Sequence, residues 1–318
     1  MQSINYVGID ISKMEFDVAM PLGEKYKHFK FSNDLAGFKK LLADLPENTQ
    51  VVMEASGPYY LQLACFLFDQ GIEVSVINPL VIRRFCQMRL SRTKTDKKDA
   101  VMIAEYGKAE KPSGWVPDKD YVMELRQLQA TRDLFDKHRT SLIRQQEAFS
   151  CVPVISVEVR KAIKQAIKNI EKQIAVLEAK MQLLIKQYHG TMYQQLQTIP
   201  GLGKKTSLLL IVLSGGFSRF SNARQLSSYI GICPRIFESG TSVKGRSRIT
   251  KMGMSRIRAM LYLCAWSAKK CNQKCKDIYD RLVANGKPKR LALIAVANKL
   301  LKQAFAIATK QTTYYPNY

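Results

Sequence analysis

The sequence has few features of a secreted, zinc-binding or membrane-spanning protein. Its seven cysteines are odd in number and scattered, and no CxxC pair occurs, which argues against a disulfide framework or a zinc site. No stretch approaches the roughly 18 uninterrupted apolar residues that a spanning helix needs. The first residues, MQSINYVGIDIS, contain no charged region followed by an apolar one, as a secretory leader would. We therefore expect a cytoplasmic protein with no membrane among its partners.

Acidic residues are also scarce, with 26 Asp and Glu against 50 Lys and Arg, a net charge of +24. Such an excess favours a polyanionic partner, with nucleic acid first and an anionic membrane surface as the weaker alternative. A hydrophobic fraction of 46% excludes a disordered basic tail, and 318 residues favour two or three domains. Residues 1–110 hold 14 basic and 14 acidic side chains, whereas residues 111–318 hold the other 36 and 12. The basic charge therefore belongs to the second part of the chain.

The first part has the pattern of an α/β domain, which we place at residues 1–115. Short apolar or alternating runs predict five strands, at residues 4–9, 15–20, 26–31, 50–53 and 73–77. Helices are expected from a cap at Ser32 or Asn33 to about Leu45, and over residues 59–69. Three hairpin-connected strands followed by alternating strands and helices predict a mixed sheet with helices packed on it.

The middle of the chain is helical and carries a heptad pattern. Apolar residues recur in steps of four and three at Ile163, Ile167, Ile170, Ile174, Leu177, Met181, Leu184 and Tyr188. A weaker seam over residues 121–149 is interrupted by Arg132 and Arg139. These patterns predict a helical hairpin or coiled-coil arm over residues 116–192 that could dimerise, with two helices of a globular bundle as the alternative. Residues 193–318 are expected to form a mostly α-helical domain.

Four carboxylates stand at the ends of predicted elements in the neutral domain. Asp10 and Glu54 each end an apolar strand, and Asp96 and Asp99 lie three residues apart where a helix begins. Carboxyl ends of strands are where sites form in open α/β sheets, and oxygen ligands of this kind suit Mg²⁺ or Mn²⁺. The plain alternative is that these residues cap turns, and that Thr95 caps a helix whose dipole Asp96 and Asp99 complement.

The series VGIDIS, MEASGPYY, VINP and KTDKKDAVMIAEY closely resembles the N-terminal domain of the DEDD transposases, the bridge-RNA-guided recombinases of bacterial insertion sequences. The resemblance implies a ribonuclease H-like (RuvC-like) fold, in which Asp10, Glu54, Asp96 and Asp99 form the catalytic acidic tetrad and hold a divalent metal.

Two segments of the basic half suggest contacts with nucleic acid. The run TIPGLGKKTSLLLIVL (198–213) has a helix-hairpin-helix pattern, in which the amides of Gly201 and Gly203, with Lys204 and Lys205, could hold phosphate. A glycine-turned helix pair in a core is the alternative. Residues 235–258 concentrate cations among Gly, Ser and Thr, as expected for a loop lying along phosphates, although a solvated face would have the same composition. These cations are Arg235, Lys244, Arg246, Arg248, Lys251, Arg256 and Arg258.

The same segment resembles the transposase domain of that family. Its ESGTSVKG (238–245), followed by ITKMG (249–253), matches the family's serine motif, and YDRLVANGKPKRLALIAVANKLL fits downstream. The resemblance implies that Ser239 is a nucleophile, with Ser242 as its nearest competitor. No histidine lies near Ser239 in sequence, so no Ser-His-Asp arrangement can be inferred.

The resemblance as a whole implies a site-specific DNA recombinase of a transposable element. Its implied partners are donor and target double-stranded DNA, a guide RNA and further copies of the chain, as a dimer that assembles into a tetramer in the bacterial nucleoid. One alternative is a metal-dependent junction nuclease that uses water. A non-catalytic RNA- or DNA-binding protein is another, and a kinase of the actin–hexokinase type is disfavoured because the chain turns basic and helical where that fold needs glycine-rich phosphate loops.

Overall fold

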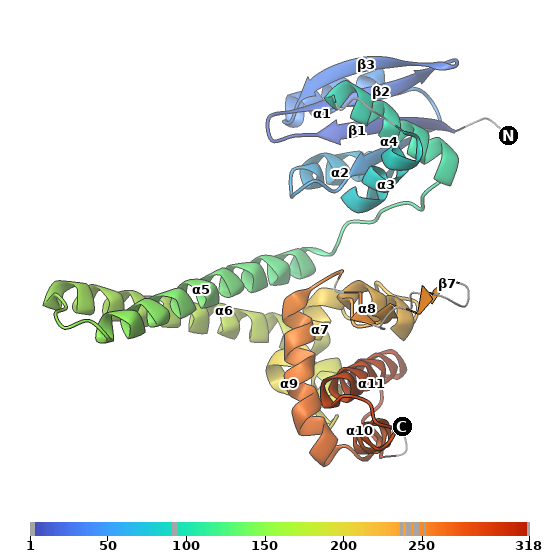
Figure 1. Ribbon diagram of the computed structural model, residues 1–318. Coiled ribbons are helices and arrows are strands. Elements are labelled where there is room, and N and C mark those ends of the chain that lie inside the picture. Colours follow the sequence, from blue (N-terminus) through green and yellow to red (C-terminus); the bar gives the residue numbers. More distant parts are fainter. Residues whose placement is uncertain are drawn as a thin grey trace. The chain divides into compact units, whose positions relative to one another are not determined.

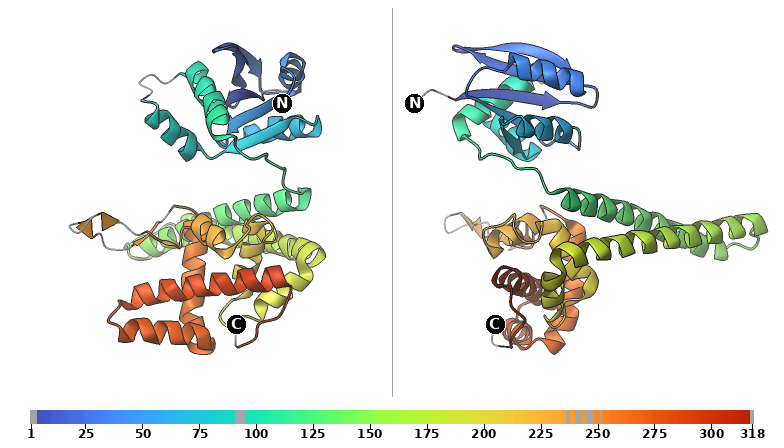
Figure 2. Two further views of the ribbon diagram at one scale, coloured as in Figure 1. Left: turned by 90° about the vertical axis from the view of Figure 1, so that its right-hand side faces the viewer. Right: turned by 180° about the vertical axis from the view of Figure 1, so that it is seen from behind.

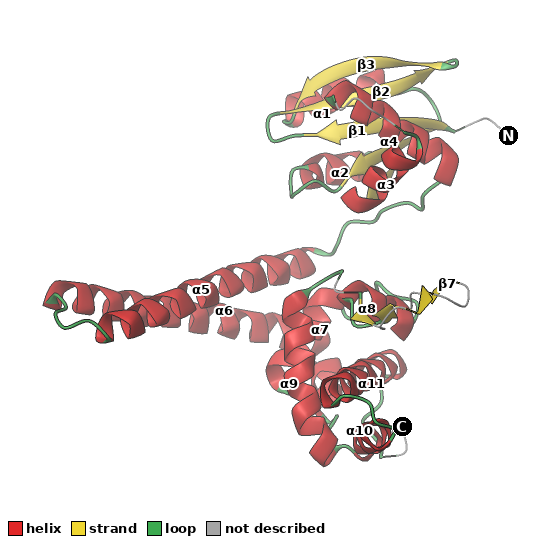
Figure 3. Cartoon of the chain, viewed as in Figure 1, coloured by secondary structure: helices red, strands yellow, loops and turns green. Residues whose placement is uncertain are grey.

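The computed structural model describes residues 4–90, 95–235, 238–239, 243–244, 248–250 and 252–316. It divides into two compact units, Met1–Pro117 and Asp118–Tyr318. The first unit holds a mixed sheet with helices and the second is mostly helical, which confirms the predicted fold class at this level (Figure 3). The predicted boundary between residues 192 and 193 lies inside a single helix, so the finer division of the second unit stays a prediction.

The sheet of the first unit has the strand order β3-β2-β1-β4-β5. β1 pairs antiparallel with β2, and β2 with β3, whereas β1, β4 and β5 run parallel. The strands are β1 (Asn5–Ile11), β2 (Glu15–Leu22), β3 (Lys25–Ser32), β4 (Thr49–Glu54) and β5 (Glu73–Ile77). All five predicted strands are present, each with bounds within two residues of the prediction or equal to it. The parallel part places the carboxyl ends of β1 and β4 side by side.

Helices cover both faces of the sheet (Figure 1). Alternate residues of the strands pack against the two layers. Val7 and Ile9 pack with helices α1 (Leu35–Asp44) and α2 (Tyr60–Asp69) on one face. Tyr6 and Val52 pack with α3 (Pro79–Met88) and α4 (Asp96–Glu110) on the other. The α4 face is unusually close to the sheet, because a Cβ on Gly8 would lie 2.1 Å from the carbonyl oxygen of Ala100. Only glycine at this position lets α4 cross β1 so closely.

In the second unit, two long helices form the arm (Figures 1 and 2). α5 (Asp120–Ser150) and α6 (Val157–Gln197) lie side by side and are joined by residues 151–156. The α6 seam lies against α5, with Ile174, Met181 and Leu184 buried. The weaker α5 seam continues through Arg132, whose side chain is only 11% exposed, because carboxylates satisfy its guanidinium within the arm. Arg132 and Arg139 are therefore polar residues within the α5 seam, and the contact between the two helices continues past them.

The rest of the second unit is a compact body of helices that also buries one end of the arm. It contains α7 (Lys204–Ser214), α8 (Ala223–Ile230), α9 (Ser255–Cys271), α10 (Gln273–Ala284) and α11 (Lys289–Lys310). α11 is long and apolar enough to cross a membrane by length and composition, but 61% of its apolar window is buried in the body. A buried core helix passes the same test, so this helix is only a weak indication of a membrane.

Some expectations about individual elements were wrong. Helices α3 and α10 were not expected, and the cap of α1 is Asp34, which accepts from the Gly37 amide at 2.8 Å, and not Ser32 or Asn33. The expected loop after residue 233 contains two short antiparallel ladders, because β6 (Pro234–Arg235) pairs with β9 (Arg248–Ile249) and β7 (Glu238–Ser239) pairs with β8 (Val243–Lys244). The glycine and serine content of the segment predicted a loop. Composition does not show which residues pair through their backbones, and here the paired residues are 4 to 15 positions apart.

Candidate functional site

The strand register brings two of the predicted carboxylates together. Ile9 is paired with Met53 across β1 and β4, so the next residues, Asp10 near the end of β1 and Glu54 at the end of β4, lie beside each other. Both belong to the alternate set that faces α4, together with Gly8 and Val52. Glu54 is also fixed by a hydrogen bond from the Ser56 hydroxyl, which donates to Oε1 at 2.6 Å. The predicted convergence of these two strand ends is therefore present.

The other two carboxylates lie in the first turn of α4, the helix that covers this face. Thr95 caps the helix, accepting from the Lys98 amide at 3.3 Å, as the sequence predicted. Asp96 is exposed and Asp99 is partly buried. Ala100 of α4 lies against Gly8 of β1, and Gly107 lies against Tyr6, so α4 runs antiparallel to β1 and its first turn lies at the same end of the sheet as Asp10. Capping and clustering thus occur together and are not alternatives.

The pKa of Asp10 reflects the nearness of the other carboxylates. Its pKa is raised from 3.8 to about 6, first by burial and then by the negative charges of Asp99, Asp96 and Glu54, in that order. Burial and like charges both disfavour the ionised form. Four carboxylates at this distance repel one another unless a cation or a proton neutralises part of their charge. The pKa of the Cys86 thiol is also raised, by burial and then by Asp99 and Glu54, which places α3 at the edge of the same cluster.

Sequence reasoning missed a fifth carboxylate, Asp17. It pairs in register with Asp10 across β1 and β2, is only 6% exposed, and contacts His28 Nε2 at 2.6 Å. Lys30, on the same face of β3, contacts Glu15 Oε1 at 2.5 Å. The signal was available, because an aspartate inside the apolar run EFDVAM on a strand is costly to bury without a partner. The short connection between β1 and β2 would have put it opposite Asp10.

The donor set of this cluster suits a hard divalent cation. Its donors are carboxylate oxygens, and Mg²⁺ or Mn²⁺ would neutralise the negative charge that, after burial, raises the pKa of Asp10. Among the described residues, no group of three or more His, Cys, Asp or Glu side chains has the geometry to hold a metal ion. Asp10, Glu54, Asp96 and Asp99 therefore lie near one another without forming a finished coordination sphere.

The predicted nucleophile, Ser239, lies on β7, where its backbone pairs with Val243 of β8. Arg235, Lys244 and Arg248 lie on the same pair of ladders. Arg246 and Lys251, together with the competing Ser242, fall outside the described residues. Ser239 and Lys244 thus share one two-stranded ladder, and Arg235 and Arg248 lie on the other.

The other predicted nucleic-acid residues have different surroundings. Arg258 donates from Nη1 to the carbonyl oxygen of Ile230 at 2.8 Å, so it stabilises the end of α8. Arg256 contacts Asp133, and Lys205 contacts Glu178 at 3.4 Å, so both cations already have carboxylate partners on the arm. Lys204 is exposed. These contacts give Arg258 a structural role that the charge pattern alone did not indicate.

The segment predicted as a helix-hairpin-helix consists of the end of α6, a turn and α7. Gly201 has a φ of +93°, and a Cβ there would lie 2.6 Å from the Cβ of Ala268 on α9, so this glycine serves packing. Gly203 is the cap of α7, with no side-chain cap, and a Cβ at this position would meet nothing within 4 Å. Gly201 is therefore needed for packing against α9, whereas no packing contact requires glycine at position 203.

Comparisons with known proteins agree with this arrangement. Residues 7–149 match a family model described as a transposase, of the DEDD type, and residues 193–280 match one described as the transposase IS116/IS110/IS902 family. A pilin gene-inverting protein of Moraxella lacunata is 32% identical over 317 residues, 96% of each chain. A transposase of the insertion sequence IS1111A from Coxiella burnetii is 24% identical over 358 residues, covering 99% of this chain and 92% of its own. The two matched regions contain all five predicted catalytic residues, and the chain belongs to the IS110/IS116 family of transposases, enzymes of DNA recombination.

Proposed function

We propose that this recombinase cuts and rejoins DNA through a covalent phosphoserine at Ser239, assisted by a ribonuclease H-like domain whose carboxylates bind Mg²⁺ or Mn²⁺. The observation that carries the proposal is the convergence of Asp10, Glu54, Asp96 and Asp99 on the α4 face of the sheet. A cluster of this charge has no evident structural purpose, because it raises the pKa of Asp10 and destabilises its ionised form.

The serine step conserves phosphodiester bonds. The Oγ of Ser239 forms a bond to phosphorus and loses its proton, while the bond from phosphorus to a deoxyribose oxygen breaks and that oxygen leaves as a hydroxyl. A hydroxyl of the partner strand then attacks the phosphoserine and releases the serine. No water is consumed, so strands are exchanged without net hydrolysis. A cation of the same ladder, Lys244, whose backbone pairs with Glu238 next to Ser239, would stabilise charge on the attacked phosphate.

The metal would be held by Asp10, Glu54, Asp96 and Asp99. When bound, a divalent cation supplies charge neutralisation at a phosphate and lowers the pKa of a coordinated hydroxyl or water. The carboxylates of this chain contribute orientation: Glu54 is held by Ser56, and Asp96 and Asp99 are fixed by the capped first turn of α4. Protons compete with the cation for Asp10, so metal binding should weaken below about pH 6.

We further propose that a guide RNA and two DNA duplexes bind the basic second unit. The first 110 residues are electrically neutral, and the whole net charge of +24 lies beyond them. Counterion release from both RNA and DNA would use such an excess. Recombination also needs several active sites, and the arm offers a surface for a dimer that assembles into a tetramer.

Trapping of the covalent intermediate tests this function. The protein, with the RNA that co-purifies with it, is mixed with labelled duplex DNA and Mg²⁺ and then denatured. The native chain should yield a protein–DNA adduct that survives denaturation, and Ser239→Ala should yield none. Ser242→Ala is the matched control, because it removes an identical hydroxyl from the same motif and should retain the adduct.

The result also separates the alternatives. If Ser239→Ala cleaves DNA as fast as the native chain, the protein is a metal-dependent nuclease and the serine mechanism fails. If Asp10→Asn is as active as the native chain, the carboxylate cluster has no catalytic role. Loss of activity in Asp10→Asn with nucleic-acid binding intact would argue against a protein that only binds.

Inversion of a DNA segment is a second candidate for the overall outcome. It is favoured by the relatives named pilin gene-inverting protein in Moraxella lacunata and Moraxella bovis, each 32% identical over 317 residues. The same strand exchange inverts a segment when its two sites lie in opposite orientation on one molecule. A plasmid that carries the flanking sequences of the native gene in both relative orientations would distinguish inversion from excision and insertion.

A further inference from the structure

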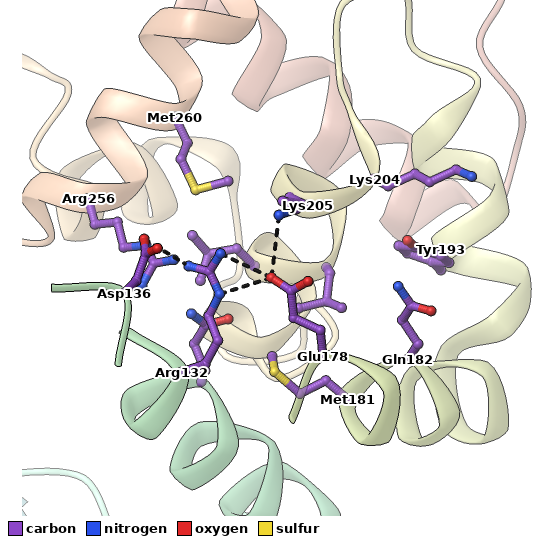
Figure 4. Close-up of a pocket in the computed structure, with 13 residues that line it drawn as sticks. Arg132, Asp136, Glu178, Met181, Gln182, Tyr193, Lys204, Lys205, Arg256 and Met260 are labelled. Atoms are coloured by element: carbon purple, nitrogen blue, oxygen red, sulfur yellow. Dashed lines mark hydrogen bonds and ion pairs between the residues drawn. The ribbon is translucent and has the colours of Figure 1, made fainter. Parts of the chain in front are cut away.

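A cavity of about 280 Å³ lies where the arm meets the body of the second unit (Figure 4). Its apolar wall is formed by Met181, Leu208, Leu209 and Met260. Its polar wall carries the cations Arg132, Lys204, Lys205 and Arg256, together with Asp136 and Glu178. Met181 of the arm and Leu209 of the body also belong to the core that the two parts share, so the charged cavity opens directly beside their packed contact.

Two ion pairs cross this space from the arm to the body. Asp133 of α5 contacts Arg256 of α9, and Glu178 of α6 contacts Lys205 of α7 at 3.4 Å. Both carboxylates are shared, because Arg132 of the arm contacts Glu178 at 3.0 Å and Asp133 at 3.7 Å. In Figure 4, Arg132 and Lys205 approach the same end of Glu178. Each of these two carboxylates thus serves two cations.

The cations around the cavity outnumber the carboxylates. Arg132, Lys204, Lys205 and Arg256 face Asp133, Asp136 and Glu178. The crowding affects Arg256, whose pKa is lowered to about 10, first by burial and then by the charge of Arg132. A further anion would relieve this repulsion, and phosphate oxygens are strong acceptors for paired guanidinium groups.

Lys205 and Arg256 also occupy particular places in the sequence. Lys205 is in the first turn of α7, directly after the hairpin of residues 198–203, and Arg256 is in the first turn of α9, directly after the segment that carries Ser239. Both belong to segments that the charge pattern assigns to nucleic acid. In the protein without nucleic acid, arm carboxylates occupy both cations.

We propose that this cavity receives a phosphate group of a nucleic-acid backbone, and that Asp133 and Glu178 hold Arg256 and Lys205 until that phosphate displaces them. The displacement breaks the two ion pairs that cross from the arm to the body, so binding of nucleic acid loosens the charged side of the arm–body contact while the shared apolar core stays packed. Asp133 and Glu178 are positioning residues, because they act through the cations and do not touch the DNA. This inference rests on the proposed role of Lys205 and Arg256 in nucleic-acid binding.

The exchange is energetically accessible because the four crossing side chains are between 26% and 72% exposed. Ion pairs with this exposure are worth little, since water and salt screen them and competing anions reach them. Arg132 is different, at 11% exposed, and keeps Asp136 at 3.5 Å when Glu178 and Asp133 turn away. The arm therefore retains a partner for its own buried guanidinium after release.

Spin or fluorescent labels on the two exposed cysteines test the release. Cys151 lies at the end of α5, far along the arm, and Cys271 ends α9 in the body; both are exposed, whereas the other cysteines are buried or partly buried. Labelled full-length protein is diluted with unlabelled protein, so that distances within one chain dominate. Addition of a saturating 20-mer duplex DNA or, separately, a 20-mer RNA should shift or broaden the distance distribution. Unchanged distances with both nucleic acids overturn the proposal.

A pair of isocharge variants makes the test local. Asp133→Asn with Glu178→Gln removes the two crossing carboxylates, and the control, Glu147→Gln with Glu171→Gln, removes two exposed carboxylates of the same helices that do not line the cavity. Both change the net charge by +2. The crossing variant should show the released distances without nucleic acid and bind the DNA about three- to tenfold more tightly than the control, the sum of two exposed ion pairs. Equal distances and equal affinities in both variants overturn the proposal.

A third variant separates this inference from the function on which it rests. Lys205→Gln with Arg256→Gln should weaken DNA binding at least about tenfold, the effect of two lost phosphate contacts. If it binds as the native chain does, the proposed nucleic-acid role of these cations fails, and the inference fails with it. If it weakens binding while the crossing variant behaves as its control, only the inference fails.

Discussion

At the scale of single residues, the site is a cluster of carboxylates, and its effect on ionisation is seen in the raised pKa of Asp10. The strand register sets Asp10 beside Glu54 and opposite Asp17, and the first turn of α4 adds Asp96 and Asp99. Each neighbour makes ionisation of Asp10 less favourable, and burial makes it less favourable still. A carboxylate whose ionised form is disfavoured in this way supports the proposed metal site.

Asp10 makes the stability of the metal-free protein depend on pH. Its folded pKa of about 6 lies above the ordinary 3.8, so the folded form holds a proton that the unfolded form releases. The stabilisation from this proton is fully present below pH 3.8 and is lost as pH rises through 6. In EDTA, Asp10→Asn should therefore melt about 2–5 °C above the native chain at pH 7 and within about 1 °C of it at pH 4.

Thermal unfolding followed by circular dichroism at the two pH values measures this difference. Glu24→Gln, in the exposed turn between β2 and β3, removes a carboxylate outside the cluster and should melt with the native chain at both. A native chain and Asp10→Asn that melt together at pH 7 would mean that the carboxylates do not repel one another in solution.

The sequence was sufficient to predict the four carboxylates, because each stands at a strand end or in a capped first turn. It was insufficient for Asp17, whose position depends on the register between β1 and β2 and so on the length of a turn. It also could not separate Arg258, which holds the end of α8, from Arg256, which reaches the arm. Residue type and spacing are the same for both, and only packing assigns their partners.

At the scale of elements, the contact between α4 and β1 positions the site. Gly8 allows this contact, because any side chain would enter the backbone of α4 at Ala100 and Ala104. The pattern of apolar residues predicted the strand but gave no sign of the distance between strand and helix. Such a close approach depends on the absence of a side chain. The sequence has 17 glycines and does not show which of them a close contact requires.

Gly8→Ala should separate α4 from β1 and destabilise the first unit by about 2–4 kcal/mol, at the upper end for overpacking. Urea unfolding followed by tryptophan fluorescence would measure it, since Trp115 packs on the core of this unit. Gly190→Ala is the matched control, because a Cβ there meets nothing within 4 Å. A Gly8→Ala protein as stable as this control would show that α4 does not lie so close.

The arm depends on a seam whose members differ in burial. Ile174 is 6% exposed, whereas Val176, two residues along the same helix, is 63% exposed. Ile174→Ala should cost the arm about 2–4 kcal/mol, and Val176→Ala less than about 0.5 kcal/mol. Hydrogen exchange of the amides of α5 and α6 reports the loss directly, as faster exchange confined to the arm. Equal exchange in the two variants would contradict a seam at Ile174.

At the scale of the whole molecule, the two units divide carboxylate chemistry from positive charge. The first unit has its own core around β1 and β4, and the second has a separate core of helices. The distribution of charge along the sequence predicted this division, because the composition of each part of the chain is the same whatever its fold. The polyanion partner inferred from the net charge agrees with the family, whose members act on DNA.

Binding of nucleic acid should follow this division. The fragment 118–318 should bind duplex DNA with nearly the salt dependence of the full chain, and the fragment 1–117 should bind at least about a hundredfold more weakly. With six or more phosphate contacts, affinity should fall roughly a thousandfold between about 50 and 200 mM salt. Fluorescence anisotropy over a salt series measures the slope. A shallow slope for fragment 118–318 would contradict the assignment of its cations to phosphates.

Because α6 bends at the base of the arm, a small rotation there would move the far end of the arm by a larger distance. The helix departs from helical geometry at His189, whose Nε2 meets the Tyr121 hydroxyl at 3.1 Å and whose ring touches the space above Gly216. From Arg132 to Ser150 the arm extends about 27 Å, at about 1.5 Å per residue. A rotation of about 15° at the base therefore moves the far end by about 7 Å, more than the pitch of one helical turn. Any second chain that grips the far end would be shifted by a full turn of its contacts for a small change at the base.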